Sequence, residues 1–305
     1  MTKQLIGTFL LGLGIAGLTQ CKGPLKPPPG DPDNGGLILP GGFVALTVVD
    51  SIGRARHLAV NDNGDIYVKL EYNDRMKGKG GTVGLRDTDG DGKADSIVYF
   101  GDYTDVGGSA VGMTIHDGYL YTSTVTSVLR TKLTSGDLIP KSKTEVVLTD
   151  TRQLVNHYWH NTKPLAFDND GHMYVPFGAP TNAGQDLSLY GPTGIPGGHG
   201  LDPEPGLADY AGIWRFDVDK TGQTQKDGYK FAGGIRSVVG MTWNPTDNSL
   251  YLVMNGIDNF HTLFPDKYSS WQAAVLPAES LIKVKDGSDF GWPYSYYYQM
   301  LGKNM

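Results

Sequence analysis

Four segments of the chain repeat one pattern, and this repetition constrains the fold more than any other feature of the sequence. Each segment has a short apolar strand, a polar turn with Asp, Asn or Gly, and a second apolar strand that contains an aromatic residue. This pattern predicts a β-hairpin. The segments are HLAVNDNGDIYVKL (57–70), GMTIHDGYLYTSTV (112–125), PLAFDNDGHMYVPFG (164–178) and GMTWNPTDNSLYLVMNG (240–256).

The spacing of the hairpins predicts how they assemble. The strand tyrosines Tyr67, Tyr121 and Tyr174 are 54 and 53 residues apart, and Tyr251 follows after 77, with a Gly/Pro-rich insertion (191–206) in the longer interval. Three hairpins are followed by a further strand with a basic residue, in SVLRTKL, GIWRFDVD and SLIKVKDG. A period near 50 residues made of short strands is typical of a β-propeller blade. We therefore expect an all-β propeller.

The length suits about five blades. Residues 43–305 number 263, just under five repeats, and the last stretch, GWPYSYYYQMLGKNM, has no element that would close a ring. A propeller closes by pairing its last blade with its first, because an open ring leaves strand edges exposed. The sequence is expected to be either a five-bladed ring or part of a longer propeller, and we favour a fragment of a longer product.

Composition supports this fold and excludes one class of partner. The 305 residues include 43 Gly, 18 Pro and 17 Tyr, which suits short strands joined by tight turns. The formal net charge is −6 and no basic stripe appears, so nucleic acid is not expected as a partner.

The N-terminus indicates export. Lys3 precedes an apolar stretch (5–18) that is too short for a comfortable membrane span, and Cys21, the single cysteine, follows it. Residues 1–21 resemble a bacterial lipoprotein signal with Cys21 lipidated, although Gln20 replaces the usual small residue. The alternative is an ordinary secretory signal. Residues 22–42 are rich in Pro and Gly and suit a linker between a membrane and a domain at 43–305.

An acidic loop, RDTDGDGKADSIVYFG (86–101), is similar to the first half of an EF-hand loop. Position 12 of such a loop would be Val98, which cannot bind metal, and the following VYF predicts a strand, so an EF-hand switch is excluded. Four carboxylates with glycines between them can still wrap calcium, and the alternative is a solvated acidic turn. The four are Asp87, Asp89, Asp91 and Asp95.

Three stretches near the starts of the predicted inner strands carry candidate chemistry. His157 and His160 precede the third hairpin, and a neutral histidine there could take a proton from an alcohol. Arg236 precedes the fourth hairpin in the equivalent place and could hold an anionic cofactor. Gly256, in MNGIDNF, lets backbone carbonyls approach a ligand or ion. For each side chain the alternative is a packing or ion-pair role.

These stretches occur in an order that resembles a known family. The order is His160, Pro164-Leu-Ala-Phe, Asp170-Gly, Tyr174-Val, Gly178, Asn182, Gly-Ile-Arg236, Gly240, Trp243-Asn-Pro, Asn255-Gly-Ile-Asp258, Pro277-Ala-Glu279 and Phe290-Gly-Trp-Pro293. It is similar to the glucose/sorbosone dehydrogenase family, exported six-bladed propellers that oxidise sugars with pyrroloquinoline quinone and calcium. The likeness covers about residues 43–298, and the DTDGDGKAD loop resembles one in sorbosone-dehydrogenase-like lipoproteins.

The resemblance implies roles for particular positions. His160 would be the catalytic base, and Arg236 would contact the quinone oxygens, beside Ser237 where the family often has Asn. Asn182 and His157 would face the sugar. The backbone carbonyls of two residues would hold the cofactor-site calcium with support from a neighbouring carboxylate; these residues are Gly256, Ile257 and Asp258.

The implied protein is a periplasmic or outer-membrane-associated lipoprotein that passes electrons from an aldose or sorbosone-like sugar to a quinone or cytochrome acceptor. Two departures limit the analogy. His157 and Trp159 surround His160 differently from the glucose enzymes, and the cationic residues of the family's last blade have no counterpart. The alternative is a non-catalytic lipoprotein that binds carbohydrate or a partner. A lactonase-type propeller fits less well, because no set of Asp, Asn and Glu side chains converges among the predicted inner-strand starts.

Overall fold

The computed structural model describes residues 28–71, 80–103, 112–151, 160–276 and 279–305, which fall into two compact units, Met1–Thr47 and Val48–Met305. The described part of the first unit has one 3-10 turn, Asn34–Gly36, which the Asp33 carboxylate caps by accepting from the Gly35 N–H at 3.0 Å. Cys21 and the predicted signal (1–21) lie outside the described residues. The proposed domain start at residue 43 stays a prediction.

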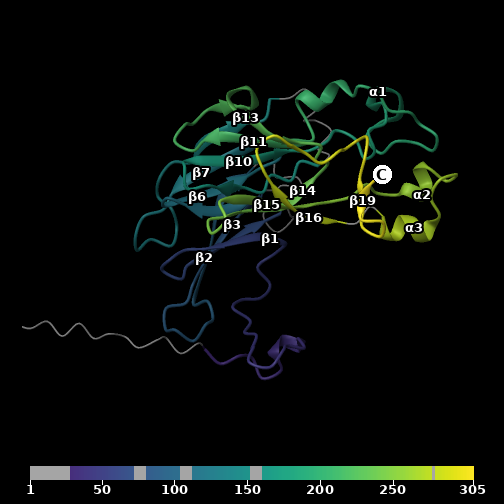
Figure 1. Cartoon of the computed structure of the whole chain (residues 1–305). Helices are drawn as coiled ribbons and strands as arrows, with labels where there is room; N and C mark the ends of the chain where they lie inside the picture. Colours follow the sequence, from purple (N-terminus) through teal and green to yellow (C-terminus); the bar gives the residue numbers. More distant parts are fainter. Residues whose placement is uncertain (1–27, 72–79, 104–111, 152–159, 277–278) are drawn as a thin grey trace, which may run out of the picture. The chain divides into compact units, whose positions relative to one another are not determined.

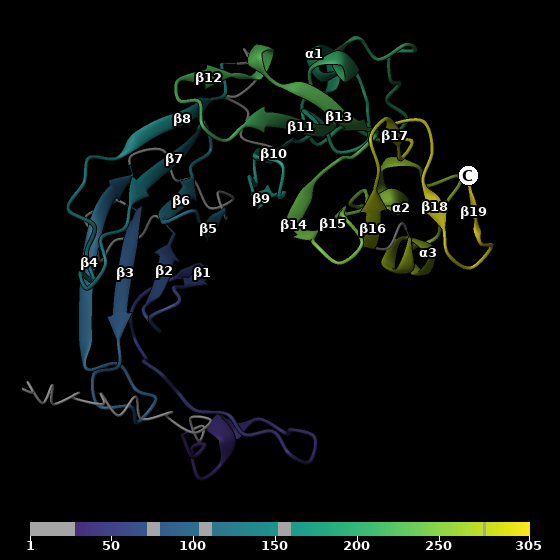
Figure 2. The same ribbon diagram turned by 60° about the vertical axis from the view of Figure 1, so that its left-hand side comes forward.

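The second unit is built mainly from four sheets, each with an antiparallel set of main strands, that follow one another along the chain (Figures 1 and 2). The first sheet contains β1 (Ala55–Val60), β2 (Ile66–Leu70), β3 (Gly80–Arg86) and β4 (Ser96–Tyr103). The second contains β5 (Met113–His116), β6 (Tyr119–Ser123), β7 (Ser127–Lys132) and β8 (Glu145–Thr149). The third contains β9 (Ala166–Phe167), β10 (His172–Phe177), β11 (Gly212–Asp217) and β13 (Tyr229–Gly233). The fourth contains β14 (Val238–Asn244), β15 (Ser249–Met254) and β16 (Ser280–Val284).

The four predicted hairpins are confirmed as β1–β2, β5–β6, β9–β10 and β14–β15. The three predicted basic strands are β7, β11 and β16, and each pairs with the tyrosine strand before it. The register places a tyrosine opposite a basic residue in all three sheets: Tyr121 opposite Arg130, Tyr174 opposite Arg215, and Tyr251 opposite Lys283. The repeat in the sequence is therefore a repeat of cross-strand pairs.

Short strands fasten neighbouring sheets together. β12 (Gln223–Thr224) leaves the third sheet and pairs in parallel with β8 of the second. β17 (Ser288–Asp289) follows β16 and pairs in parallel with β13 of the third sheet. Each crossing segment satisfies backbone groups at the outer edge of the preceding sheet, which would otherwise be open to pairing with another chain.

The apolar core lies between the faces of neighbouring sheets. One cluster joins Tyr121 and Leu148 of the second sheet to Met173, Phe177 and Phe216 of the third. Another cluster packs the third sheet against β14–β16 of the fourth. The first strands of adjacent sheets also contact each other, β1 with β5 and β9 with β14. This arrangement of sheets packed face to face about their first strands is that of a β-propeller.

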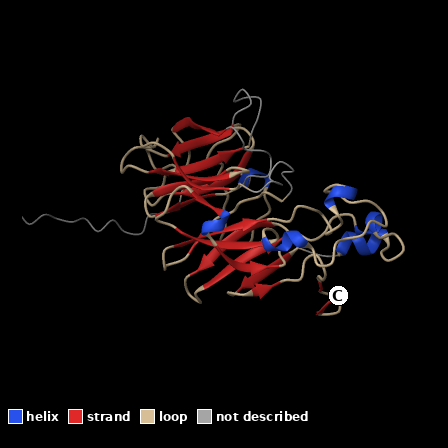
Figure 3. Ribbon diagram, turned by 90° about the horizontal axis from the view of Figure 1, so that it is seen from above, coloured by secondary structure: helices blue, strands red, loops and turns tan. Residues whose placement is uncertain are grey.

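The last part of the chain differs from a fifth blade. Between β15 and β16 the chain forms two short helices, α2 (Phe260–Leu263) and α3 (Ser270–Val275). The aromatic end forms a two-stranded hairpin of β18 (Tyr297–Tyr298) and β19 (Lys303–Asn304). The described residues thus give four blade sheets and a hairpin, because helical segments take up length that the spacing assigned to strands. The helices of the described residues are short, and Figure 3 draws them as small blue pieces among many strands; another of them is α1 (Leu187–Tyr190).

Within the described residues, no helix has both the length and the apolar character needed to cross a membrane.

Candidate functional site

Arg236 is the centre of a buried polar cluster. It lies two residues before β14 and is only 3% exposed. Its Nε donates to the Asn182 carbonyl at 2.9 Å, and one Nη donates to Asn182 Oδ1 at 2.6 Å and to Asp258 Oδ2 at 2.8 Å. Burial lowers the pKa of the guanidinium, and the Asp258 charge opposes that shift. The arginine remains charged, since its pKa starts far above neutral pH.

Asn182 hydrogen-bonds to both other members of this cluster, the Arg236 side chain and the Asp258 backbone. Its Nδ2 donates to the Asp258 carbonyl at 2.8 Å, and its Oδ1 accepts from the Asp258 N–H at 2.9 Å. The Trp292 indole N–H donates to the Asn182 carbonyl at 3.4 Å. The side chain predicted to face sugar is thus 3% exposed and engaged by the protein itself. Its sugar contact stays a prediction.

His160 joins the same cluster through one backbone residue. His160 Nδ1 lies 2.8 Å from the Ala179 carbonyl, and the Ala179 N–H donates to the Arg236 carbonyl at 2.8 Å. The carbonyl accepts the Nδ1 proton, which leaves Nε2 as the basic nitrogen of the neutral ring. Burial first, and the Arg236 charge second, lower the pKa of His160 to about 4. At neutral pH the ring is therefore an unprotonated base.

The backbone around His160 is unusual. Its φ is 52°, in the left-handed region that residues other than Gly, Asn and Asp rarely adopt. Gly178 makes this possible, since a Cβ there would lie 2.1 Å from the His160 carbonyl oxygen and 2.6 Å from its Cβ. The glycine of the VPFG sequence thus allows His160 to approach the end of β10.

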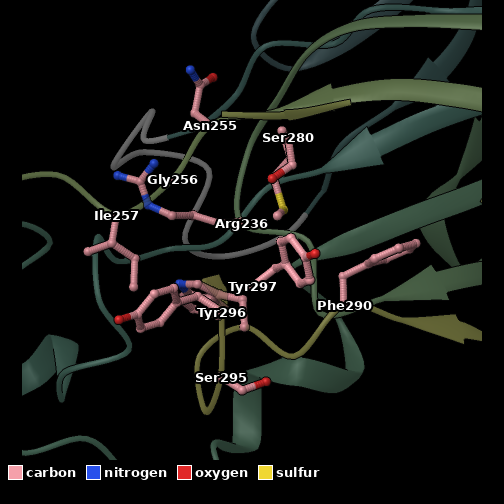
Figure 4. Close-up of a pocket in the computed structure, with 11 residues that line it drawn as sticks. Arg236, Asn255, Gly256, Ile257, Ser280, Phe290, Ser295, Tyr296 and Tyr297 are labelled. Atoms are coloured by element: carbon pink, nitrogen blue, oxygen red, sulfur yellow. The ribbon is translucent and has the colours of Figure 1, made fainter. Parts of the chain in front are cut away.

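A small cavity of about 30 Å³ lies beside the arginine (Figure 4). Arg236, Gly256 and Ile257 line it together with Tyr296 and Tyr297, which bring the aromatic end of the chain to the cluster. The backbone of the proposed calcium residues is therefore next to the guanidinium. Ser237 is buried, and its carbonyl accepts from the Asn255 N–H at 3.0 Å, so it fixes the chain that leads to Gly256.

His157 and Trp159 lie outside the described residues. Their predicted positions around the sugar stay predictions.

The acidic loop joins β3 to β4 as a tight turn, so the predicted strand after it is confirmed. Oxygens of Asp87, Asp89 and Asp95 lie within 4.8 Å of one another, whereas Asp91 accepts from the Lys93 N–H at 2.7 Å and is not part of this group. Backbone N–H groups of Gly90 and Gly92 lower the pKa of Asp87, and the Thr88 hydroxyl and N–H lower that of Asp95. Both carboxylates are ionised at neutral pH.

Sequence reasoning missed a second buried polar site. Lys163 Nζ lies 3.0 Å from Asp150 Oδ2, both side chains are fully buried, and the ammonium lies 5.1 Å from the centre of the Phe177 ring. The only signal was a lysine and an aspartate beside predicted inner strands, and charged residues occur at many strand ends. Trp292 was noted only as part of a motif, and its hydrogen bond to Asn182 was not predicted.

Several solved structures of carbohydrate-active enzymes and sugar dehydrogenases resemble the chain. The family AA12 carbohydrate-active enzyme of Trichoderma reesei matches with a TM-score of 0.59 and 17% identity, over 82% of this chain and 59% of that one. The PQQ domain of pyranose dehydrogenase from Coprinopsis cinerea matches with a TM-score of 0.61 and 15% identity, over 86% and 59%. The aldose sugar dehydrogenase of Escherichia coli matches with a TM-score of 0.51 and 14% identity, over 82% and 66%.

The chain has the propeller fold of these enzymes. The predicted fold class is confirmed, and so is the resemblance to quinone-dependent sugar dehydrogenases, at the level of the fold. The chain spans about three-fifths of the length of the first two matches. No protein-family model matches the sequence, and no curated protein matches it.

Proposed function

We propose that this chain is an exported quinone-dependent sugar dehydrogenase, or the greater part of one. The observation that carries the proposal is that a neutral, buried histidine and a buried arginine both hydrogen-bond to Ala179. His160 Nδ1 bonds to the Ala179 carbonyl, and the Ala179 N–H bonds to the Arg236 carbonyl. A base and a fixed cation close together are what alcohol oxidation needs, because a proton leaves the hydroxyl while negative charge develops on the electron acceptor. The fold of the compared enzymes supports the same chemistry.

In this proposal His160 Nε2 takes the proton from the sugar hydroxyl. The Ala179 carbonyl holds the imidazole in the required tautomer, and burial, with the positive charge of Arg236 second, keeps the ring unprotonated at neutral pH. Pyrroloquinoline quinone, when bound, would accept the hydride. Asp258 and Asn182 fix the guanidinium so that it does not have to reorganise during the reaction.

The residues around Arg236 fit such a group in their donor set. Nε and one Nη are occupied, whereas Nη1 makes no hydrogen bond within the described residues. This nitrogen can donate to a quinone oxygen, and the carbonyls of Gly256 and Ile257 can supply ligands for calcium. Tyr296 and Tyr297 line the same cavity, so their rings would contact a quinone held there.

The decisive experiment is a titration of the purified chain with pyrroloquinoline quinone, with and without calcium, followed by quinone absorbance. We expect calcium-dependent binding that Arg236→Ala removes and that Arg56→Ala, an exposed arginine on β1, leaves unchanged. Absence of binding, or equal binding by Arg236→Ala, would contradict the proposal. Circular dichroism of each variant establishes that it is folded.

A second candidate function is non-catalytic binding, and it is favoured by the hydrogen bonds that Arg236 already makes to Asn182 and Asp258. If these contacts are purely structural, the chain is a non-catalytic propeller that binds carbohydrate or a partner. In that case His160→Asn leaves sugar binding unchanged, and the quinone does not bind. The two functions are therefore separated by the same titration with one additional variant.

Export and lipid attachment at Cys21 belong to the same proposal. Labelling with a radioactive fatty acid in a bacterial host is expected to mark the wild-type chain and not Cys21→Ser. An unlabelled wild-type chain in the periplasm would favour the ordinary secretory signal.

A further inference from the structure

The segment between β10 and β11 lines a second and larger cavity, of about 710 Å³, that is open to solvent on one side. This volume is within the roughly 300–1,000 Å³ that small-molecule sites usually have. Its polar lining comes from the segment between β10 and β11, which contains the insertion at 191–206, and includes Thr181, Asp186, Ser188, Glu204 and Tyr210. None of these residues belongs to the Arg236 cluster, although Asn182 directly follows Thr181.

The wall of this cavity is held in place by one buried side chain. Gln185 is 2% exposed, its Oε1 accepts from the Ile195 N–H at 2.8 Å, and its Nε2 donates to the Ile195 carbonyl at 3.0 Å. A Cβ at Gly194 or Gly198 would lie 2.5 Å from Gln185 Oε1, which explains both glycines. The cavity is therefore preformed, which lowers the entropic cost of binding.

Asp186 and Glu204 both line this space, and among the described residues no basic side chain lines it. Asp186 uses Oδ1 to cap α1 by accepting from the Ser188 and Leu189 N–H groups, and Glu204 uses Oε1 to accept from the Gly206 N–H at 3.2 Å. Within the described residues, the second oxygen of each carboxylate accepts no hydrogen bond. Burial chiefly, and the neighbouring Asp186 charge in addition, raise the pKa of Glu204, as expected for two carboxyl groups close together with no cation among the described lining residues. A cationic ligand would stabilise both carboxylates.

The remaining lining is mixed in character. Leu187, Pro192 and Leu201 provide apolar surface, and the Ser188 and Thr181 hydroxyls lie among the polar groups. A ligand that matches this lining has a positive charge for the carboxylates, several hydroxyl groups for the polar side chains and an apolar face for the apolar residues. A hexosamine has all three, because its C–H face is apolar, its ring carries hydroxyls and its amine is protonated at neutral pH.

We propose that this cavity is a binding site for an amino sugar, with Glu204 and Asp186 receiving the ammonium group. The site goes beyond the proposed oxidation, since binding here requires neither quinone nor Arg236. It would bring an amino-sugar unit next to the loop that carries Asn182.

The test is isothermal titration of the purified chain, without quinone, with glucosamine, N-acetylglucosamine and glucose. We expect glucosamine to bind at least about tenfold more tightly than the two neutral sugars, because hydrogen bonds to a charged group contribute the most. Glu204→Gln is expected to weaken glucosamine by a similar factor and to leave the neutral sugars unchanged. Asp186→Asn should weaken it too while keeping the helix cap, since Asn caps as well as Asp.

Asp219→Asn is the matched control, because it removes one exposed carboxylate that does not line the cavity. It should bind glucosamine as the wild type does. Failure of glucosamine to bind, equal binding of N-acetylglucosamine, or unchanged binding in Glu204→Gln would each overturn the proposal. The quinone titration of Arg236→Ala is unaffected by any of these outcomes.

Discussion

At the scale of single residues, the protonation of His160 governs both stability and the proposed activity. The folded pKa of about 4 lies below the ordinary value of 6.5, chiefly because the ring is buried. Between these two pH values the unfolded chain binds a proton that the folded chain does not. The free energy of unfolding is therefore not reduced by His160 above pH 6.5. It falls as the pH drops towards 4, by up to about 3 kcal/mol.

His160→Asn is the appropriate variant, because Asn tolerates the positive φ at this position. We expect its urea-unfolding free energy to depend less on pH between 6.5 and 4 than that of the wild type. His261→Asn, an exposed histidine on α2, should keep the wild-type slope. Parallel slopes for all three proteins would show that His160 titrates normally.

The Lys163–Asp150 pair makes the strongest prediction for stability. Both side chains are fully buried, so removal of the Asp150 charge takes an ionic partner away from an ammonium group that water does not reach. We expect Asp150→Asn to lower the free energy of unfolding by about 3–5 kcal/mol in urea titrations. Asp137→Asn breaks the exposed Lys141–Asp137 pair at 2.8 Å and should cost less than about 1 kcal/mol. Similar losses for the two variants would contradict this account.

At the scale of elements, the insertion after β10 depends on the fit between Gln185 and its glycines. Gly198→Ala would place a Cβ 2.5 Å from Gln185 Oε1, so we expect a loss of about 1–3 kcal/mol and faster proteolytic cleavage within 191–206. Gly240→Ala is the control, since a Cβ there meets nothing within 4 Å. The double variant Gly198→Ala with Gln185→Ala should relieve the collision, and its resistance to protease should then depend only on the lost hydrogen bonds.

The acidic loop makes a separate prediction at this scale. If calcium binds between Asp87, Asp89 and Asp95, saturating calcium raises the unfolding temperature, by an amount equivalent to about 2.7 kcal/mol at a hundredfold excess over Kd. Asp87→Asn should remove this rise. Asp91→Asn should keep it, because Asp91 lies outside the group. No effect of calcium on the wild type would identify the loop as a solvated turn.

The hairpins could be predicted from the sequence because alternation with period two is a local property of the chain. Positions of His160 and Arg236 before inner strands were also predictable from that repeat. The bonds that hold the site were not, since Asn182 and Asp258 are 76 residues apart and no local pattern connects them. Gln185 escaped prediction for the same reason, because a polar residue in a Gly/Pro-rich segment usually faces solvent. The helices α2 and α3 were not predicted, because helices of four and six residues leave little periodicity in a sequence.

At the scale of the whole molecule, crossing strands cover the outer edges of the second and third sheets, whereas no described strand covers the outer edge of β4 in the first sheet or of β16 in the fourth. β16 pairs with β15 on one side, and no described strand pairs with its other side. Leu281 on this strand is 75% exposed. An open edge with apolar side chains favours pairing with another chain.

We therefore expect concentration-dependent self-association of the purified chain, measured by sedimentation velocity, that Leu281→Lys reduces. A lysine on an edge strand opposes pairing, since two such edges would bring like charges together. Leu189→Lys is matched in chemistry and exposure, at 70%, but lies on α1 away from any strand edge, so it should associate as the wild type does. If both variants reduce association equally, general surface hydrophobicity is the cause. If neither does, the β16 edge is protected in solution, and the fourth sheet is as complete as the second and third.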